Sequence, residues 1–394
     1  MKVLIVGGGA VGSVIARFLD SEKSVKEIIC GDKNPASAKK FLNLKSKKLS
    51  LVKLDATSEK QMLSASKDVD LIINASLPHF NPHIMNVAIK AGKNYQDLCS
   101  HLDKSHTPVQ LQFDKQFKKE NIVGLINTGM APGITNVLAK TISDKFDSVD
   151  SIKIRTLIDP NSIEPIFAMS PEITLEESTS PALVYRNRKY KLVKQFKEAE
   201  YYEFPEPIGK RFVFSVYGDE VATLPMHIKT KNVDFKSGGV DIEASKLFFD
   251  MGLLSSKPIK IGKESFVPLD LFSEKLPKVP SPKEMMDLLE KGIVQDALVV
   301  LVVEADGTRF GKKVSIKSSI VFPTLKEMAK VLPGATYISY PTGLAAFCFS
   351  KIISKIKEKG VFLPESLDSG LIQNILLELA DKNIAINEKI SKLG

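Results

Sequence analysis

The stretch that decides the fold is Lys2-Val3-Leu4-Ile5-Val6-Gly7-Gly8-Gly9-Ala10-Val11-Gly12. Its apolar first half predicts a buried strand, and the residues after Gly12 have the apolar spacing of a helix. The pattern Gly-x-Gly-x-x-Gly between them allows a tight turn at Gly7, a close approach of the backbone to a pyrophosphate at Gly9, and helix–strand packing at Gly12. The free N–H groups at the start of the helix, including those of Ala10 and Val11, then suit a phosphate group. The stretch therefore predicts a dinucleotide-binding strand–turn–helix unit.

An acidic residue follows at the distance that this unit requires. Asp32 lies 20 residues after Gly12, at the end of a predicted second strand, Glu27–Gly31. A carboxylate there accepts hydrogen bonds from the adenosine ribose and repels a 2′-phosphate, which favours NAD over NADP. Lys33 could pair with a 2′-phosphate, so NADP stays open as the cofactor. The competing interpretation is a plain glycine turn followed by a solvated aspartate.

Two further predicted strands end in residues that we expect to contact the dinucleotide. The third, Leu51–Leu54, is followed by Asp55 and Ala56, and the fourth, Val69–Asn74, ends at Asn74 and Ala75. Parallel strands of such a sheet present their carboxyl ends to the ligand. Asp55 is placed to approach the adenine, although capping of the following helix explains it equally well.

Strands and helices alternate regularly up to Ile126 and predict a doubly wound parallel sheet, which makes an α/β Rossmann domain of residues 1–130. The pattern then becomes mostly β, with helices between, and predicts an α+β substrate and dimerisation domain over 131–324. Its predicted strands include His227–Lys231, and Ala305–Thr308 is a predicted hairpin turn. Residues 325–394 are predicted to be helices that pack back on the Rossmann domain.

Composition excludes several classes of protein. Hydrophobic residues make up 43% and charged residues 26%, as in a globular protein. The three cysteines are far apart, which excludes a cysteine-based metal site and fits the cytoplasm. No apolar run reaches the ~18–20 residues that span a membrane. The net charge is +9, but the basic residues are scattered, so we expect no nucleic-acid partner and no metal.

Several motifs resemble those of the saccharopine dehydrogenase-like family, and they occur in the family's order. The ordered set covers nearly the whole chain: Asn94-Tyr95-Gln96-Asp97, Asn127 to Asn136 with Ala131-Pro132-Gly133, Leu175-Glu176-Glu177, Glu220-Val221-Ala222-Thr223-Leu224-Pro225, Thr342 to Ala346, and Gly360-Val361-Phe362-Leu363-Pro364-Glu365.

This resemblance implies an NAD(P)-dependent oxidoreductase that acts on a C–N bond of an amino acid or amine. Ala131-Pro132-Gly133 and Glu220 to Pro225 look like the lysine 6-dehydrogenase branch, which slightly favours oxidation of a lysine-type ω-amine. Gly218-Asp219-Glu220 departs from that branch, whose members usually have His-Ser-Glu here. The alternatives are a saccharopine-type or carboxynorspermidine-type imine reductase, or a non-catalytic dinucleotide sensor of the same fold.

Proton transfer beside the nicotinamide requires a carboxylate, a histidine or a lysine. Asp97 ends the predicted fifth strand and is our first catalytic candidate; His101, four residues on, and Glu220 of the second domain are the others. Their structural alternatives are a turn cap, a solvated loop and a strand end. The predicted substrate-binding residues are Thr128, Gly129 and Met130 in the loop after the sixth strand, and Asp219. Arg155 or Arg186 could bind a substrate carboxylate, although solvated arginine is the simpler interpretation.

We also predict a homodimer. The strand Ala297 to Val303 is apolar on both faces, and a strand buried on both faces needs a second covering layer. Helices of the same domain or another subunit could supply that layer, and the family resemblance favours pairing through the mostly β domain.

Overall fold

The computed structural model describes residues 1–393 and divides into two compact units. The first comprises Met1–Thr141, Ala222–Ile228 and Ser339–Ala385, and the second comprises Ile142–Val221, Lys229–Ile338 and the chain from Ile386. The chain therefore crosses between the units several times. The domain boundaries expected from the sequence, after residues 130 and 324, divide the chain into three continuous segments and remain a prediction.

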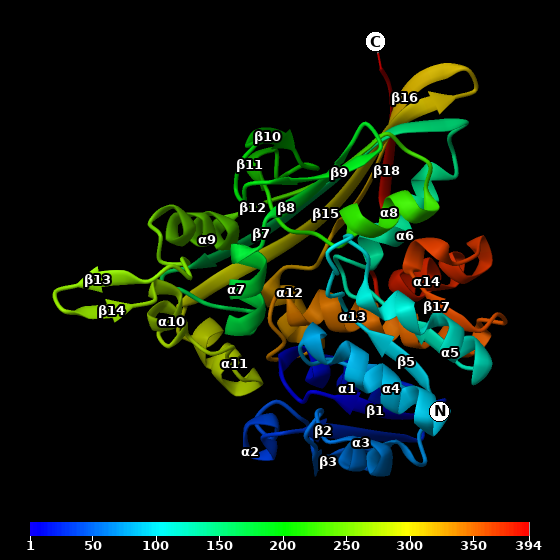
Figure 1. Cartoon of the computed structure of the whole chain (residues 1–394), viewed down its shortest axis with the longest axis vertical. Helices are drawn as coiled ribbons and strands as arrows, with labels where there is room; N and C mark the ends of the chain where they lie inside the picture. Colours follow the sequence, from blue (N-terminus) through cyan, green and yellow to red (C-terminus); the bar gives the residue numbers. More distant parts are fainter. Residues whose placement is uncertain (394) are drawn as a thin grey trace. The chain divides into compact units, whose positions relative to one another are not determined.

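The first unit is built on a seven-stranded parallel sheet in the order β17-β6-β5-β4-β1-β2-β3 (Figure 1). The strands are β1 (Lys2–Val6), β2 (Glu27–Asp32), β3 (Leu49–Lys53), β4 (Leu71–Asn74), β5 (Asn94–Asp97), β6 (Val123–Leu125) and β17 (Gly360–Phe362). The helices are α1 (Ala10–Ser21), α2 (Pro35–Ala38), α3 (Glu59–Ser66), α4 (Asn81–Ala91), α5 (Asp114–Lys119), α13 (Ser339–Ser350) and α14 (Ser369–Asp381), with most of α6 (Ile134–Ser143) and α8 (Glu220–His227).

Helices α13 and α14 pack on this unit, as the sequence predicts, but the helix predicted from Leu325 belongs to the second unit, where it contacts β15 (Val294–Arg309). Helix α13 lies along α1, and a Cβ atom placed on Gly343 of α13 would lie only 2.5 Å from Val14 Cγ1 of α1. Phe18 stacks on Phe347 with ring centroids 5.5 Å apart. The missing side chain at Gly343 therefore lets the two helix backbones approach closely.

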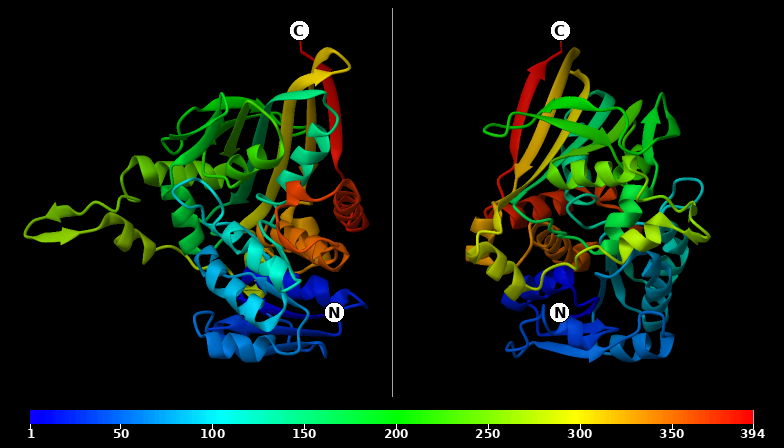
Figure 2. Two further views of the ribbon diagram at one scale, coloured as in Figure 1. Left: turned by 45° about the vertical axis from the view of Figure 1, so that its right-hand side comes forward. Right: turned by 90° about the vertical axis from the view of Figure 1, so that its left-hand side faces the viewer.

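The second unit is built on a nine-stranded sheet whose main path is β10-β11-β12-β7-β15-β16-β18, with β8 paired to β12 and β9 to β8 (Figure 2). Its strands are β7 (Ser148–Ser162), β8 (Ala182–Arg186), β9 (Lys189–Val193), β10 (Glu200–Glu203), β11 (Lys210–Ser215), β12 (Asn232–Gly238), β15 (Val294–Arg309), β16 (Lys312–Val321) and β18 (Asn387–Lys392). Its helices are α7 (Pro171–Thr179), α9 (Val240–Asp250), α10 (Pro268–Ser273), α11 (Pro282–Glu290) and α12 (Leu325–Val331). Residues 299–303 of β15 are fully buried, as their apolar pattern predicts.

Three local predictions are wrong. His227 ends helix α8, and the strand predicted at His227–Lys231 begins only at Asn232. Ala305 to Thr308 is not a turn: β15 continues through it, with a register shift between Asp306 and Gly307, and the chain reverses at Phe310 and Gly311. Gly307 serves close strand packing, because a Cβ there would lie 2.2 Å from Ser148 O. The C-terminal segment is not purely helical, since it also contains β17 and β18.

A two-stranded hairpin of β13 (Ile259–Ile261) and β14 (Glu264–Phe266) joins neither large sheet. It extends away from the nine-stranded sheet at the left of Figure 1, between α9 and α10. We call residues 240–274, which comprise α9, the hairpin and α10, the arm.

Candidate functional site

The glycine loop between β1 and α1 leaves room for a phosphate. Gly7 has a φ of +103°, and a Cβ there would lie 2.8 Å from Ala75 O of the adjoining strand end. A Cβ on Gly12 would lie 2.0 Å from Gly7 O, so only glycine permits this helix–turn packing. Around Gly9, in contrast, no atom lies within 4 Å of the Cβ position. The loop is therefore closed on its inner side and open where the start of α1 faces a ligand, which fits a dinucleotide pyrophosphate.

Asp32 lies at the end of β2, next to this loop. Its Oδ2 accepts a hydrogen bond of 2.8 Å from Gly8 N, and its Oδ1 accepts one of 2.7 Å from Asn34 N. Lys33 points instead to Asp55, with 3.2 Å between Nζ and Oδ2. Hydrogen bonds from Thr57, and then from Lys33, lower the pKa of Asp55 to about 2. The lysine that could attract a 2′-phosphate is thus paired with an ionised carboxylate.

Asn74 and Ala75 end β4 opposite the glycine loop. Ala75 N donates to Val6 O at 2.9 Å, which fixes the strand end against Gly7. The Asn74 side chain is buried; its Nδ2 donates to Asn81 Oδ1 at 2.6 Å. Ala56 belongs to the buried hydrophobic core. The cofactor contacts predicted for these residues remain predictions.

Asp97 is the centre of a buried polar cluster at the end of β5. Its side chain is 1% exposed. Oδ2 accepts hydrogen bonds of 3.0 Å from Tyr95 OH and from Gln110 Nε2, and Oδ1 accepts one of 2.9 Å from Asn127 N. These contacts fix the strand end to the loop after β6. They suit a residue that positions the loop, and a direct catalytic role for Asp97 stays a prediction.

The predicted substrate loop is built on the same cluster. Thr128 Oγ1 donates to Asp97 O at 2.6 Å and accepts from Gln96 Nε2 at 2.9 Å. Gly129 and Gly133 form an isolated β-bridge. Their backbones approach so closely that a Cβ on Gly133 would lie 2.0 Å from Gly129 O. Met130, which follows Gly129 in the sequence, is buried. Within residues 1–393, the buried Gln96 Oε1 and Asn127 Nδ2 have no hydrogen-bond partner, so the cluster can still bind water or a polar substrate group.

A second buried cluster, which the sequence did not predict, is hydrogen-bonded to this loop through Gly133. Asn136 Oδ1 accepts from Gly133 N at 2.9 Å, while Asn136 Nδ2 donates to Glu365 Oε2 at 3.0 Å and lies 3.2 Å from Thr223 Oγ1. All three side chains are fully buried, and burial raises the pKa of Glu365. Each residue belongs to a different family-like motif, but their spacing gives no sign that they meet.

In the second unit, Glu177 lies within the electrostatic reach of two other acids, Asp219 and Glu176. Asp219 is buried, and its Oδ1 lies 2.6 Å from Tyr217 OH. The Glu177 side chain reaches solvent, but the surrounding protein, followed by the nearby charges of Asp219 and Glu176, raises its pKa to about 7. Glu220, the first residue of α8, is fully buried. Crowded carboxylates of this kind are stabilised by a cation.

The other predicted site residues, one histidine and two arginines, belong to neither cluster. His101 is exposed in the loop after β5. Arg155 is neither solvated nor open to a substrate, because it is 2% exposed and contacts Asp234 and Glu200 at 3.0 and 2.7 Å. Arg186 is paired with Glu198. The Asp97 cluster lies in the first unit and the Glu177 cluster in the second.

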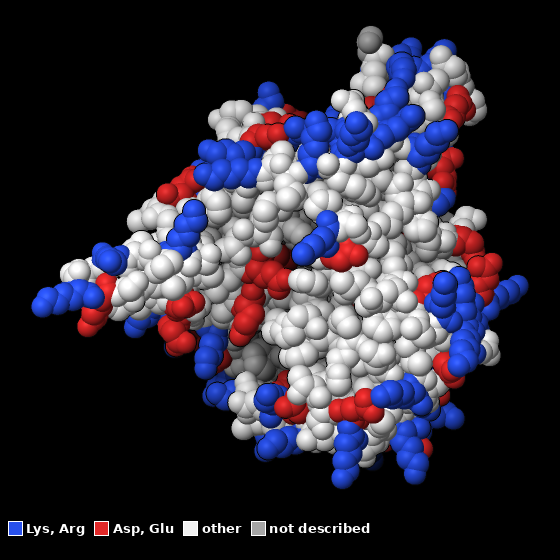
Figure 3. All heavy atoms as spheres, in the orientation of Figure 1, with Lys and Arg blue, Asp and Glu red and all other residues white. Residues whose placement is uncertain are grey.

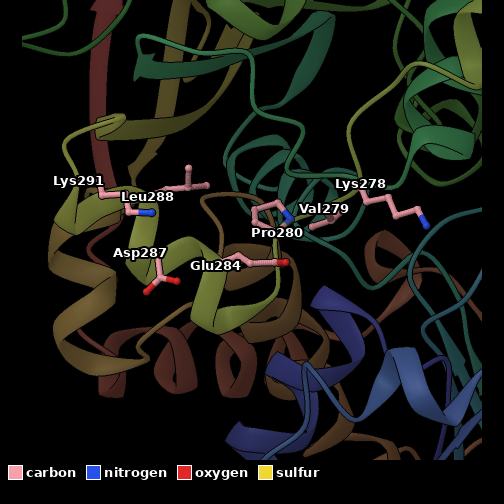
Figure 4. Close-up of a pocket in the computed structure, with 7 residues that line it drawn as sticks. All are labelled: Lys278, Val279, Pro280, Glu284, Asp287, Leu288 and Lys291. Atoms are coloured by element: carbon pink, nitrogen blue, oxygen red, sulfur yellow. The ribbon is translucent and has the colours of Figure 1, made fainter.

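A groove of about 350 Å³ lies beside α11, and none of the predicted site residues lines it. Figure 4 shows the side chains that line the groove. Its lining mixes both charges: Lys278, Val279, Pro280, Glu284, Asp287, Leu288 and Lys291. Within residues 1–393 there is no group of three or more His, Cys, Asp or Glu side chains that could hold a metal ion. In the same range, no helix combines the length and the hydropathy that a membrane crossing requires.

Comparison with known proteins gives matches along the whole chain. The saccharopine dehydrogenase NADP binding domain matches residues 3–125, and the saccharopine dehydrogenase C-terminal domain matches residues 129–384. A carboxynorspermidine synthase of Vibrio alginolyticus is 26% identical, with 93% of this chain and 92% of the relative covered. A carboxyaminopropylagmatine dehydrogenase of Synechocystis is 24% identical, with 93% of both chains covered.

Solved structures agree on the fold. Saccharopine dehydrogenase (L-Glu forming) from Saccharomyces cerevisiae superposes with a TM-score of 0.73 at 18% identity, over 99% of both chains. Homospermidine synthase from Legionella pneumophila, solved in complex with NAD, gives a TM-score of 0.71 at 12% identity, over 100% of this chain and 92% of that one. The chain therefore belongs to the saccharopine dehydrogenase family and is an NAD(P)-dependent oxidoreductase that acts on a carbon–nitrogen bond.

Proposed function

We propose that this chain joins an amine to a carbonyl compound by reducing the imine that the two form, as in a carboxynorspermidine-type reductase. The observation that carries the proposal is the cluster of Glu176, Glu177 and Asp219. An amine substrate is a cation at neutral pH, and the negative charges of Asp219 and Glu176, which help to raise the pKa of Glu177, favour the binding of a cation beside it. Two relatives that are named after polyamine products, the carboxynorspermidine synthase and the carboxyaminopropylagmatine dehydrogenase, support the choice.

The residues of the chain supply binding and orientation. When bound, the nicotinamide supplies the hydride for the imine carbon. The open N-terminus of α1 and the Gly9 backbone bind the pyrophosphate, and Asp32 accepts from the ribose. The Asp97 cluster orients Thr128, Gly129 and Met130 toward a substrate. We keep Asp97, His101 and Glu220 as the candidates for proton transfer, and Asp219 as a ligand of the ammonium group.

A second candidate function is oxidation of a lysine-type ω-amine. It is favoured by two motifs, Ala131-Pro132-Gly133 and the stretch from Glu220 to Pro225, which resemble the lysine 6-dehydrogenase branch. The same acidic cluster would then bind the ammonium group of the substrate.

A panel of substrates tests both candidates. NADH absorbance is followed with diaminopropane or agmatine plus an amino-acid semialdehyde, with lysine plus 2-oxoglutarate, and with lysine or saccharopine in the oxidising direction. We expect NADH consumption with a diamine plus the semialdehyde. Turnover of lysine alone would support the second candidate. Nucleotide binding without turnover across the panel would support a non-catalytic sensor.

We further propose that NAD(H) is preferred over NADP(H). The support is the position of Asp32 at the end of β2, where it accepts from Gly8 N of the glycine loop, and the pairing of Lys33 with Asp55. We also propose a cytoplasmic location, because the three cysteines of the chain are all free thiols, and a homodimer formed through the mostly β unit.

A further inference from the structure

The loop after β6, residues 127–133, is held by separate contacts at its two ends. At its start, Asn127 N donates to Asp97 Oδ1 at 2.9 Å. At its other end, Gly133 N donates to Asn136 Oδ1 at 2.9 Å. The loop follows the carboxyl end of a parallel strand, and this is the edge where such sheets bind their ligands. A group that fixes the Asn136 side chain therefore also fixes one end of the predicted substrate loop.

The Asn136 amide has the orientation that this contact requires, because two acceptors face its nitrogen. Nδ2 donates to Glu365 Oε2 at 3.0 Å and to Thr223 Oγ1 at 3.2 Å. Thr223 also forms a hydrogen bond with the Glu365 carboxyl group, so the three side chains form a closed ring. The amide oxygen is then the atom that faces Gly133 N. A reversed amide would place its NH2 group against this N–H donor, where neither group can accept a hydrogen bond.

Glu365 has a different environment from the acidic residues at the surface. On the face drawn in Figure 3, acidic side chains reach solvent, and several lie beside lysine or arginine side chains. Glu365 is 0% exposed, burial raises its pKa, and only hydrogen bonds oppose this effect. Within residues 1–393, its buried Oε1 has no hydrogen-bond partner. A carboxyl group in this environment keeps its proton, so Glu365 is a neutral hydrogen-bonding group.

We propose that Glu365 is a positioning residue for the reaction: it orients the Asn136 amide, and the amide holds Gly133 and the substrate loop in the conformation that receives the substrate. Glu365 lies in the short helix η4 (Pro364–Ser366), which follows β17, the strand that pairs with β6. Because its side chain is fully buried, it acts through Asn136 and not by contact with a substrate. The inference rests on the proposed role of residues 128–130 in substrate binding.

Stability alone explains this cluster less well. Replacing a buried hydrogen-bonded pair by apolar groups of the same shape is often nearly neutral for the free energy of unfolding. Apolar groups cannot, however, select one of the two orientations of an amide. The loop contains Gly129 and Gly133, which have no side chains that could fix its conformation. The polar ring therefore supplies a constraint that the loop itself lacks.

Two substitutions at Glu365 test the proposal without any substrate. Glu365→Gln is neutral and keeps an oxygen acceptor for Asn136 Nδ2, whereas Glu365→Met has a similar length but no strong acceptor. The measurement is hydrogen exchange at the Gly133 amide, followed by NMR. Exchange should become at least about threefold faster in Glu365→Met, because Asn136 Oδ1 no longer holds Gly133 N, and should stay at the wild-type rate in Glu365→Gln. The matched control is Glu358→Met, at an exposed glutamate of the same C-terminal segment.

Kinetics then show whether the position of the loop matters for the reaction. For the substrates that the panel identifies, kcat/KM should fall at least about tenfold in Glu365→Met and recover in Glu365→Gln. NADH affinity, measured by titration, should be the same in both variants and in wild type. The pyrophosphate site is the glycine loop between β1 and α1, which contributes no residue to the ring. Retained NADH binding also shows that each variant is folded.

Wild-type exchange at Gly133 or wild-type kcat/KM in Glu365→Met would overturn the proposal, as would a Glu365→Gln variant that behaves like Glu365→Met. If Glu365→Met does not fold, Thr223→Val takes its place, because valine keeps the shape of threonine and lacks the hydroxyl group. Faster exchange at Gly133 in that variant supports the proposal, and unchanged exchange overturns it. If wild type turns over no substrate of the panel, the proposed function fails, and the exchange rates alone decide whether Glu365 positions the loop.

Discussion

Asp32 connects the glycine loop to the second strand and is the residue that we expect to select the cofactor. Asp32→Ala removes an ionised acceptor from the adenosine ribose and from Gly8 N. A hydrogen bond to a charged group contributes about 1.5–3 kcal/mol, so NADH affinity should fall by about tenfold or more. NADPH affinity should fall less or rise, because a repulsive charge is lost. Isothermal titration measures both, with the exposed Asp68→Ala as control. An unchanged ratio of the two affinities would contradict this role.

Glu177 should give amine binding a dependence on pH. Its pKa is raised to about 7, so the carboxyl group loses its proton as the pH rises from 6 to 8. The ionised form attracts an ammonium group, and KM for the amine should therefore fall over this range while kcat changes less. Glu177→Gln should raise KM and flatten this part of the profile. Initial rates at each pH provide the measurement, and the exposed Glu358→Gln should behave as wild type. A profile that Glu177→Gln leaves unaltered would count against an amine site here.

The contact between α1 and α13 depends on the absence of a side chain at Gly343, which lets the two helices approach closely. Alanine usually stabilises a helix by up to about 1 kcal/mol relative to glycine. At Gly343, however, the added Cβ would lie 2.5 Å from Val14 Cγ1, and overpacking typically costs about 1–3 kcal/mol. Gly343→Ala should therefore lower the melting temperature by several degrees, whereas Gly370→Ala at the exposed start of α14 should leave it unchanged or raise it. Scanning calorimetry of both variants tests the contrast, and equal shifts would contradict it.

Elements whose signal is local could be predicted from the sequence. The unit β1–α1–β2 is an example, because apolar runs, glycine spacing and Asp32 lie within one short stretch. Strand β17 has only three residues and exists because it pairs with β6, so no pattern in its own sequence reveals it. The turn predicted at Asp306 and Gly307 was wrong for a similar reason, since that glycine serves contact with a neighbouring strand. In the site, the glycine loop was predictable. The Asn136–Thr223–Glu365 cluster was not, because its partners are 87 and 229 residues from Asn136.

At the scale of the whole molecule, the two units should respond separately to loss of β18. This strand covers one edge of the nine-stranded sheet by pairing with β16, while the dinucleotide loop belongs to the other unit. A chain ending at Ala385 exposes the long edge of β16, and such an edge promotes aggregation. We expect unchanged NADH affinity in the soluble fraction, together with a lower melting temperature and concentration-dependent light scattering. A truncated protein as stable and soluble as wild type would refute the need for this edge strand.

Strands β17 and β18 also determine the order in which the protein can mature during translation. Each completes one edge of a different sheet, yet both come from the last 35 residues of the 394. The ribosome releases the glycine loop and the first six parallel strands long before either sheet has its last edge strand. A nascent chain that has formed β6 and β16 therefore carries one open edge in each sheet until β17 and β18 emerge. This is the interval in which a chaperone would have most to protect.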